Sequence, residues 1–285
     1  MPLPTPLTSA PELLARLGTP DWPIVLDCSF DLADTSAGET AHAAGHLPGA
    51  IYSHLDRDRC SPKTARGAID GGRHPLPTRA AFAATLAHCG IGADTPVLAY
   101  DAQGSPYAAH AWWLLRWMGH RNVAVLDGGL AAWQAAGGPV ERGVGERSPA
   151  AAPYPQRAPA MPTVSADELL AAPGQALLVD ARAPERFRGE VEPLDSQAGH
   201  IPGARNRFFK LNVGADGRFL PAAELRRVFE SFGVPPDRMV HHCGSGVTAC
   251  HNLLAMETAG LAGSALYAGS WSEWSADPTR PVAKG

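Results

Sequence analysis

One short segment combines a cysteine with a setting that makes a thiol reactive. Residues 240–248 read Val-His-His-Cys-Gly-Ser-Gly-Val-Thr, so an apolar run delivers Cys243 into a loop of small residues. The glycines at 244 and 246 allow this loop to curl, so that successive backbone N–H groups face inward. These donors and the N-terminus of the helix expected from Thr248 stabilise an anion at the sulfur. The segment therefore predicts a nucleophile that holds a thiolate or a persulfide.

Other interpretations of this cysteine are weaker. A buried, inert thiol is the usual state of the residue type. A metal site built from His241, Cys243, Cys250 and His251 would need neighbouring helical residues that point about 100° apart, and no second Cys-x-x-Cys is present, so we expect no metal. A cysteine phosphatase needs an arginine six residues after the cysteine, where this chain has Ala249.

The elements that must position the cysteine occur twice, in the same order. Each copy contains an apolar run ending in Asp, a Gly-His-x-Pro-Gly-Ala motif, a second apolar run and a glycine-containing turn before a tryptophan. The pairs are residues 23–27 and 176–180, 45–50 and 199–204, 97–101 and 239–243, and 126–133 and 267–274. In the first copy Asp101 occupies the position of Cys243.

Within each copy, short apolar runs alternate with helical spacing. In the first copy we expect strands at residues 97–100 and 123–126 and helices at residues 80–89 and 108–118. This alternation predicts an α/β fold with two tandem domains, each a parallel β-sheet flanked by helices. Such sheets bind ligands at the carboxyl ends of their strands, where we expect Asp27, Asp101, Asp180 and Cys243.

Composition suggests where these domains begin and end. Residues 139–162 are rich in proline and glycine and read as a linker. We therefore expect an N-terminal domain at 1–138 without a catalytic cysteine and a C-terminal catalytic domain at 163–285. The first copy also carries 12 additional residues between the motif histidine and the second strand (55 residues against 43), within residues 53–78.

Charge and cysteine content restrict the partners and the compartment. The net charge is −4 and the pI about 6.2, so no basic surplus favours nucleic acid or an anionic membrane. Apolar stretches are interrupted well before the roughly 20 residues that a membrane-spanning helix needs. Five scattered cysteines, an odd number, suit reduced thiols in the cytoplasm. We expect a cytoplasmic protein without a secretory signal.

Taken together, the motifs resemble those of a known family. The loop at 243–248, the two Gly-His-[Leu/Ile]-Pro-Gly-Ala motifs and Gly-Ser-Trp-Ser-Glu-Trp at 269–274 resemble tandem-domain rhodaneses, most closely the 3-mercaptopyruvate sulfurtransferases. The resemblance spans residues 13–282. It implies two rhodanese domains and transfer of sulfane sulfur from 3-mercaptopyruvate, through a Cys243 persulfide, to a thiol, thioredoxin or cyanide. Pyruvate would be released, and no cofactor is implied.

Two alternatives use the same cysteine. The first is a thiosulfate sulfurtransferase. Because Gly244 and Ser245 are neutral where thiosulfate-preferring relatives carry two cations, a dianion would lack countercharge, and we expect 3-mercaptopyruvate to be preferred. The second alternative is a sulfur carrier or sensor without turnover, and the intact loop and the full set of matching residues argue against it.

The resemblance also assigns roles to individual residues. It implies catalytic roles for Cys243, Ser245, Asp56 and His74, a carboxylate-binding role for Arg186, and substrate contacts for Gly244, Gly246, Val247 and Thr248. It further implies that the additional stretch, with Asp56 and His74, reaches toward the cysteine of the other domain.

Other readings of single residues remain open. The family often has a second arginine where this chain has Leu194, so the second carboxylate contact is either missing or supplied by another residue, for which Arg188 and Arg182 are candidates. Asp56 lies in an Asp-Arg-Asp-Arg run that could equally be a solvated loop, and Arg186 could be a surface residue. His46 and His200 recur in both copies and are expected to be structural.

Overall fold

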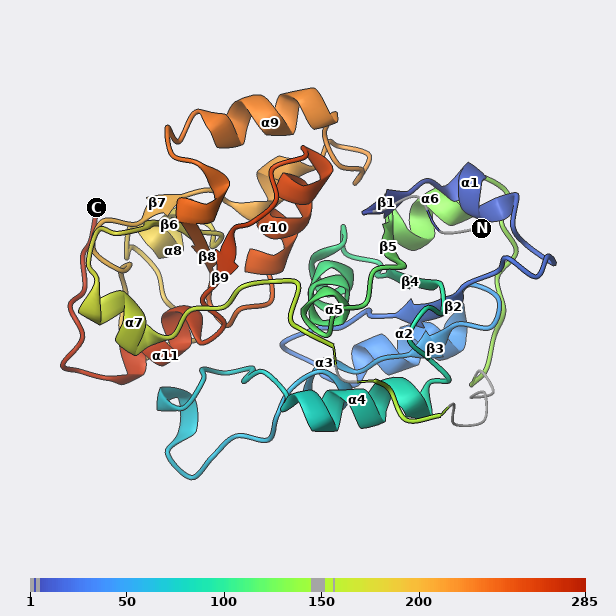
Figure 1. The fold of residues 1–285 in the computed structure, drawn as a ribbon, viewed down its shortest axis with the longest axis horizontal. Coiled ribbons are helices and arrows are strands. Elements are labelled where there is room, and N and C mark those ends of the chain that lie inside the picture. Colours follow the sequence, from blue (N-terminus) through green and yellow to red (C-terminus); the bar gives the residue numbers. More distant parts are fainter. Residues whose placement is uncertain (1–2, 4–5, 145–151, 156) are drawn as a thin grey trace. The chain divides into compact units, whose positions relative to one another are not determined.

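A computed structural model describes residues 3, 6–144, 152–155 and 157–285 of the chain. These residues form two compact units (Figure 1). The first unit comprises Met1–Arg59, Pro77–Ala160 and Val213–Phe219, and the second comprises Cys60–Leu76, Met161–Asn212 and Leu220–Gly285. The domain boundaries expected from composition stay a prediction, and part of the expected linker, residues 145–151 and 156, lies outside the described residues.

The first unit is a five-stranded sheet flanked by helices, with strand order β1-β5-β4-β2-β3 and every pair parallel. Leu98 and Tyr100 of its central strand, β4, pack with Leu13 and Trp133 from the helices in one buried cluster. The elements are β1 (Leu7–Thr8), α1 (Ala10–Leu14), β2 (Ile24–Asp27), α2 (Ala37–Ala44), β3 (Ile51–Tyr52), α3 (Leu55–Asp58), α4 (Arg79–His88), β4 (Val97–Tyr100), α5 (Pro106–Trp117), β5 (Val123–Leu126) and α6 (Gly129–Ala135).

The second unit repeats the plan with a four-stranded parallel sheet of order β7-β6-β8-β9. Val240 packs with Tyr267, Trp271 and Trp274 in its core. Its elements are η1 (Gly67–Ile69), α7 (Ala166–Ala171), β6 (Leu177–Asp180), α8 (Pro184–Phe187), β7 (Arg205–Asn206), η2 (Phe209–Asn212), α9 (Ala222–Glu230), η3 (Pro236–Arg238), β8 (Met239–His242), α10 (Ala249–Thr258), β9 (Ala265–Leu266) and α11 (Ser270–Ala276).

The repeat expected from the sequence is confirmed by topology. In both units the strand that ends in Asp pairs with the strand that precedes Asp101 or Cys243. The predicted strands 97–100 and 123–126 have those bounds, and the two predicted helices are α4 and α5. Thr78 caps α4 by accepting the amide of Ala81 at 3.1 Å. The α/β fold with two parallel sheets is therefore confirmed.

The two motif histidines are structural in both units. His46 and His200 are buried, and their Nδ1 atoms bond to the backbone carbonyls of His42 at 2.7 Å and Phe187 at 2.8 Å. Each histidine also forms a backbone bridge, with Glu141 and with Ala283 respectively. The motif therefore serves the fold rather than the chemistry.

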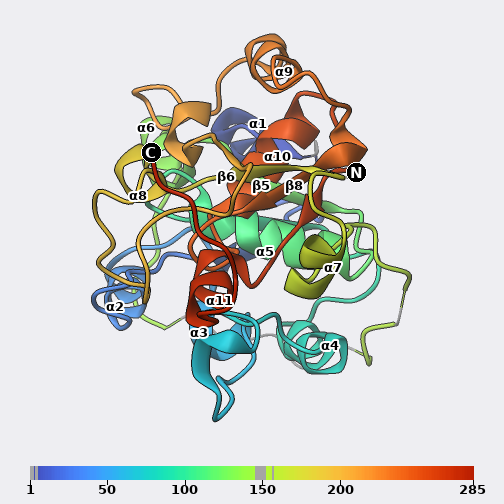
Figure 2. The same ribbon diagram turned by 90° about the vertical axis from the view of Figure 1, so that its left-hand side faces the viewer.

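Residues 60–76, which form most of the segment 53–78 that contains the 12 additional residues, belong to the second unit. Their short helix η1 packs against α11, and Figures 1 and 2 both show the loop (cyan) beside that helix (red). The amides of Gly71 and Arg73 donate to the side chains of Glu273 at 3.2 Å and Ser272 at 2.9 Å. This packing brings residues 73 and 74 to the side of α11 on which the cysteine loop lies.

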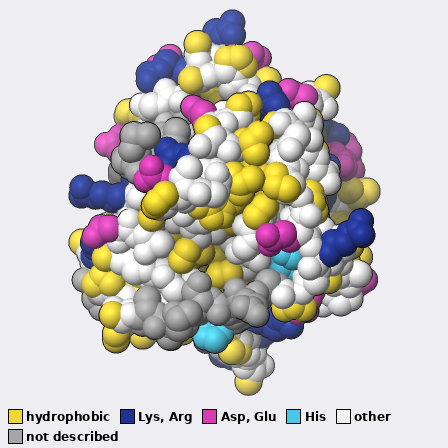
Figure 3. All heavy atoms as spheres, turned by 90° about the vertical axis from the view of Figure 1, so that its right-hand side faces the viewer, with side chains coloured by type: hydrophobic (Ala, Val, Ile, Leu, Met, Phe, Trp, Pro, Cys, Tyr) yellow, Lys and Arg dark blue, Asp and Glu magenta, His cyan; other side chains and the backbone are white. Residues whose placement is uncertain are grey.

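Within the described part of the chain, no helix is long and apolar enough to cross a membrane. On the face at the right of Figure 1, hydrophobic side chains gather near the middle, while the described lysines and arginines stand apart from one another (Figure 3).

Candidate active site

Hydrogen bonds from the start of α11 fix the beginning of the cysteine loop. Cys243 directly follows β8 and is 2% exposed. Its amide donates to Ser270 Oγ at 3.1 Å, and its carbonyl accepts the amide of Trp271 at 3.0 Å. The carbonyl of Gly244 accepts the amide of Ser272 at 2.8 Å. Because the N–H of a trans peptide points opposite to the preceding carbonyl, the amides that follow point away from α11.

The amides of the cysteine loop are open, which here means that their N–H groups have no acceptor in the described part of the chain. Among the described residues, none accepts a hydrogen bond from the amides of residues 244–248. These amides lead into the N-terminus of α10, where the helix dipole adds partial positive charge. Consecutive N–H groups at a helix start form an anion site. The loop therefore offers its donors to a sulfur anion or to a bound anionic group.

The first unit shows the same loop with its donors occupied. Asp101 follows β4 at the position that corresponds to Cys243, and it is completely buried. Its carboxylate accepts four backbone amides at 2.8 to 2.9 Å, from Gln103, Ser105, Tyr107 and Ala108. The loop after this strand can therefore hold a carboxylate with its backbone amides, and in the first unit that carboxylate is the side chain of Asp101.

Glycine is required at one position of the catalytic loop. Gly246 has φ +80°, a conformation that other residues rarely adopt, and a Cβ there would lie 2.4 Å from the carbonyl oxygen of Ala268. The carbonyl of Gly246 also accepts the thiol of Cys250 at 3.3 Å. Burial raises the pKa of the Cys250 thiol well above its usual value, so this residue supports the loop as a neutral donor.

The segment at 60–76 places an imidazole beside the loop. His74 is 5% exposed, and its Nδ1 lies 2.7 Å from Oγ of Ser245, which is 6% exposed. One of the two groups donates to the other according to the tautomer of the imidazole. A hydroxyl linked to an imidazole can pass a proton, which is the chemistry a leaving enolate requires.

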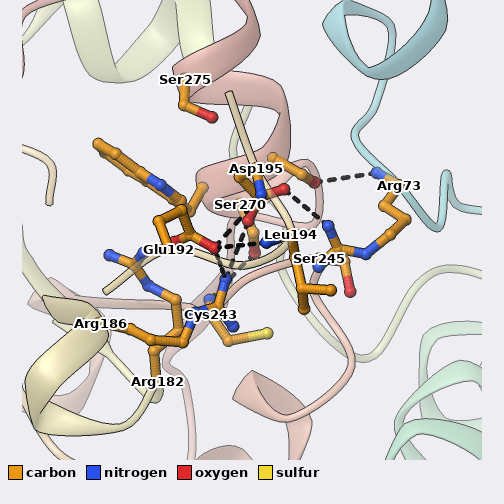
Figure 4. Close-up of polar contacts among 12 residues, drawn as sticks. Arg73, Arg182, Arg186, Glu192, Leu194, Asp195, Cys243, Ser245, Ser270 and Ser275 are labelled. Carbon is orange, nitrogen blue, oxygen red and sulfur yellow. Dashed lines mark hydrogen bonds and ion pairs between the residues drawn. The ribbon is translucent and has the colours of Figure 1, made fainter. Parts of the chain in front are cut away.

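Two arginines from distant segments share one carboxylate near the loop (Figure 4). Asp195 accepts Nη1 of Arg73 at 2.6 Å and Nη2 of Arg186 at 3.0 Å. Arg186 also donates to Glu192 at 2.6 Å. Burial raises the pKa of Asp195, and the guanidinium of Arg73 offsets part of this effect. Each carboxylate oxygen accepts an N–H group from a guanidinium, and these two contacts favour the ionised form.

The expectation that a dianion at the loop would have no countercharge is wrong in one respect, because two arginines lie beside Gly244. A Cβ built on Gly244 would lie 3.2 Å from Nη2 of Arg73 and 3.4 Å from Nη1 of Arg186. The sequence pattern missed this because both cations come from outside the loop. Their charge is balanced locally by Asp195 and Glu192.

Neither Arg182 nor Arg188 is placed to replace the missing family arginine. Arg182 is buried, forms an ion pair with Asp180 at 2.7 Å and stacks over Trp271. Arg188 is exposed and pairs with Glu190 at 2.7 Å. Neither arginine is therefore placed to supply the second carboxylate contact, whereas Arg73 lies beside Gly244.

Asp56 is exposed in α3 of the first unit, where its amide donates to Nδ1 of His54 at 3.1 Å. The structure thus brings together Cys243, Ser245, His74 and Arg186 in the second unit and holds Asp56 in the first.

The histidines before the cysteine are not arranged for a metal. Within the described part of the chain, no group of three or more His, Cys, Asp or Glu side chains has the geometry of a metal site. Burial lowers the pKa of His241 to about 3, and its Nε2 faces Sδ of Met256 at 3.0 Å. His241 is therefore a neutral core residue.

Sequence reasoning missed four residues around the cysteine. Ser270 holds the Cys243 amide from a left-handed backbone with φ 55°, and Arg73, Glu192 and Asp195 form the ion-pair cluster. Two signals were available, since Ser270 lies in the Gly-Ser-Trp-Ser-Glu-Trp motif and Arg73 stands next to His74 in Gly-Gly-Arg-His-Pro.

The fold and the loop define an α/β enzyme with a cysteine at the start of a loop whose amides have no acceptor among the described residues, and comparison with known proteins places it in a family. A model described as "Rhodanese-like domain" matches residues 9–136 and 165–277. The chain is 48% identical over 283 residues to a Pseudomonas aeruginosa protein named as a probable 3-mercaptopyruvate sulfurtransferase, with 98% of each chain covered.

Two further similarities agree in fold and differ in name. A Mycobacterium tuberculosis protein provisionally named thiosulfate sulfurtransferase SseB is 41% identical over 291 residues, which cover 98% of this chain and 97% of the relative. The structure of 3-mercaptopyruvate sulfurtransferase from Leishmania major superposes with a TM-score of 0.83 at 30% identity, over 95% of this chain and 74% of that one. The chain belongs to the rhodanese family and carries two tandem rhodanese-like domains.

Proposed function

We propose that this sulfurtransferase takes sulfane sulfur from 3-mercaptopyruvate and carries it as a persulfide on Cys243. The observation that carries the proposal is the set of open amides at residues 244–248, facing the start of α10. They would stabilise the anionic sulfur before and after transfer. Gly244, Gly246, Val247 and Thr248 act in this proposal through their backbone.

The reaction balances without a cofactor. The Cys243 thiolate attacks the sulfur of 3-mercaptopyruvate, an S–S bond forms, and the C–S bond breaks with its electron pair going to carbon. The leaving enolate takes up one proton and becomes pyruvate. The sulfur remains on the enzyme as Cys243 persulfide.

The pair His74–Ser245 would manage the proton, because the hydroxyl and the imidazole are already in hydrogen-bond contact. Asp56 would assist as the family resemblance implies. Arg186 would bind the donor carboxylate, since a guanidinium matches a carboxylate with two parallel donors.

A thiol, thioredoxin or cyanide would then accept the sulfur. A thiol takes the outer sulfur as a new persulfide, and cyanide becomes thiocyanate, each regenerating the Cys243 thiol. None of the five cysteines, all of which the structure describes, forms a disulfide, which suits a reducing compartment, and we propose the cytoplasm. The loop of the first domain would carry no sulfur itself, because the carboxylate of Asp101 fills it.

Thiosulfate is the second candidate donor, and two guanidiniums near Gly244 are the observation that favours it. Steady-state turnover with both donors decides between them. We expect kcat/KM to be at least tenfold higher for 3-mercaptopyruvate, because the acidic partners of both arginines leave little net charge for a dianion. Equal or better use of thiosulfate would reverse the assignment.

A further inference from the structure

One carboxylate sets the direction of two arginines. Asp195 binds Arg73 through Oδ1 at 2.6 Å and Arg186 through Oδ2 at 3.0 Å, and Figure 4 shows it among these residues. The two guanidiniums reach it from segments more than one hundred residues apart in the chain, at 122 and 9 residues from Asp195 respectively. The side chain of Asp195 is 3% exposed, so the bridge is shielded from water.

Arg73 and Arg186 each have one terminal guanidinium nitrogen that takes no part in the bonds to Asp195. Nη2 of Arg73 and Nη1 of Arg186 make no hydrogen bond with a described residue, and both lie next to Gly244. The Nε atoms of the two arginines are buried and likewise have no partner among the described residues. A guanidinium holds its N–H donors in one plane. The unused donors of Arg73 and Arg186 lie beside the same glycine, so together they fit a single planar anion such as a carboxylate.

Neither residue 194 nor Arg182 supplies a second cation beside Gly244. Leu194 is 48% exposed and only its amide contacts the cluster, at 3.2 Å from Glu192. The guanidinium of Arg182 already donates to Asp180 at 2.7 Å and to Glu192 at 3.2 Å. Among the described arginines, Arg73 therefore stands where a second cation for the donor would be needed.

We propose that Arg73 is the second carboxylate-binding residue of the donor site and that Asp195 is the positioning residue that aims Arg73 and Arg186 at the donor. This rests on the proposed function, because it assumes a carboxylate-bearing donor. Arg73 replaces, from another segment, the arginine that the family often carries at position 194. Asp195 touches the arginines and not the donor.

The test compares two donors that differ only in the carboxylate. 3-Mercaptopyruvate carries it, and mercaptoacetone has the same thiol and ketone with a methyl group in its place. For Arg73→Ala we expect kcat/KM for 3-mercaptopyruvate to fall roughly 10- to 150-fold, mainly through KM, the loss of one charge-assisted contact. With mercaptoacetone we expect a change within about threefold, since no contact is lost.

A second variant keeps the test informative if Arg73→Ala is destabilised. Adding Leu194→Arg to Arg73→Ala restores a cation from the other side, and we expect it to recover at least part of the lost KM. Equal losses with both donors, or no loss with either, would overturn the role of Arg73. Wild-type enzyme that does not turn over 3-mercaptopyruvate would instead overturn the proposed function.

Asp195→Asn tests the positioning role. The amide keeps the shape but cannot accept from both guanidiniums, so KM for 3-mercaptopyruvate should rise while mercaptoacetone turnover stays nearly constant. In the double variant with Arg73→Ala the combined loss should be smaller than the sum of the two single losses, because part of the Asp195 effect acts through Arg73 and only the part that acts through Arg186 is left. The matched control is Glu190→Gln, which removes an exposed carboxylate paired with Arg188. It should leave KM and turnover unchanged with both donors. Additive losses would assign Asp195 a role separate from Arg73.

Discussion

His74 Nδ1 lies 2.7 Å from Ser245 Oγ, although 171 residues separate the two in the chain. Both side chains are buried, so the hydrogen bond is not in competition with bulk water. The contact links the residue stretch 60–76 to the loop that carries Cys243.

This contact predicts coupled effects on catalysis. His74→Ala and Ser245→Ala should each lower kcat by about 10²-fold, the usual loss when proton transfer is removed. The double variant should be little worse than either single variant, because each change already breaks the same relay. Steady-state rates of the three variants with 3-mercaptopyruvate test this. Losses that multiply would show that the two residues act independently.

Arg186 and Arg188 should respond differently to truncation. Arg186→Ala should lower kcat/KM for 3-mercaptopyruvate by roughly 10- to 150-fold, equivalent to about 1.5–3 kcal/mol, with lysine only partly restoring it. Arg188→Ala is the control and should have little effect, because Arg188 is exposed. Kinetics of both purified variants suffice. A normal Arg186→Ala enzyme would move the carboxylate site elsewhere.

Arg182 should instead affect stability, and its effect should depend on pH. Burial alone would raise the pKa of Asp180, but His242 and Arg182 lower it below its usual value. A lowered pKa stabilises the folded state above the unfolded value of about 3.9, and this is lost as pH falls through the folded pKa.

Arg182→Ala leaves the Asp180 charge buried without its partner and should cost about 3–5 kcal/mol at pH 7. The difference from wild type should shrink as the pH falls below the unfolded value of about 3.9 and toward the lowered pKa of folded Asp180, where its carboxylate becomes protonated. Denaturant unfolding of both proteins between pH 3 and 7 measures it. A difference that is constant with pH would exclude the ion pair as its source.

The filled loop of the first unit predicts a stability effect without a catalytic one. Asp101→Asn leaves an amide that cannot accept all four backbone N–H groups, and losing about two charge-assisted bonds should cost roughly 3 kcal/mol. Asp237→Asn, a change at an exposed position, is the control and should leave stability nearly unchanged. Unfolding in urea compares them, and equal stabilities would argue that the four amides do not depend on the carboxylate.

Local sequence was enough to predict much of this molecule. The strands at 97–100 and 123–126 are short apolar runs bounded by turns, and the cysteine loop is marked by its glycines, so both could be read from neighbouring residues. The two-domain α/β fold followed from repeated landmarks.

The ion-pair cluster could not be predicted in this way. Arg73 and Asp195 meet only because the 60–76 segment packs against α11, a contact between distant segments that leaves no periodic signal. Ser270 was hidden for a related reason, since its hydroxyl accepts the Cys243 amide from a left-handed backbone at φ 55°, a conformation that the residue type does not predict.

The central claim is that Cys243 alone carries the transferred sulfur. The other candidate thiols are ill suited, since burial raises the pKa of Cys28 to about 12 and that of Cys250 well above normal. Serine at positions 28, 60 and 89 should therefore leave turnover intact.

Intact-protein mass spectrometry after brief treatment with 3-mercaptopyruvate, without an acceptor, tests the claim most directly. Wild type should gain the mass of one sulfur atom, located on Cys243 by peptide mapping and lost on addition of cyanide. Cys243→Ser should gain none and should show no turnover. A persulfide on any other cysteine, or sulfur uptake by Cys243→Ser, would contradict the account.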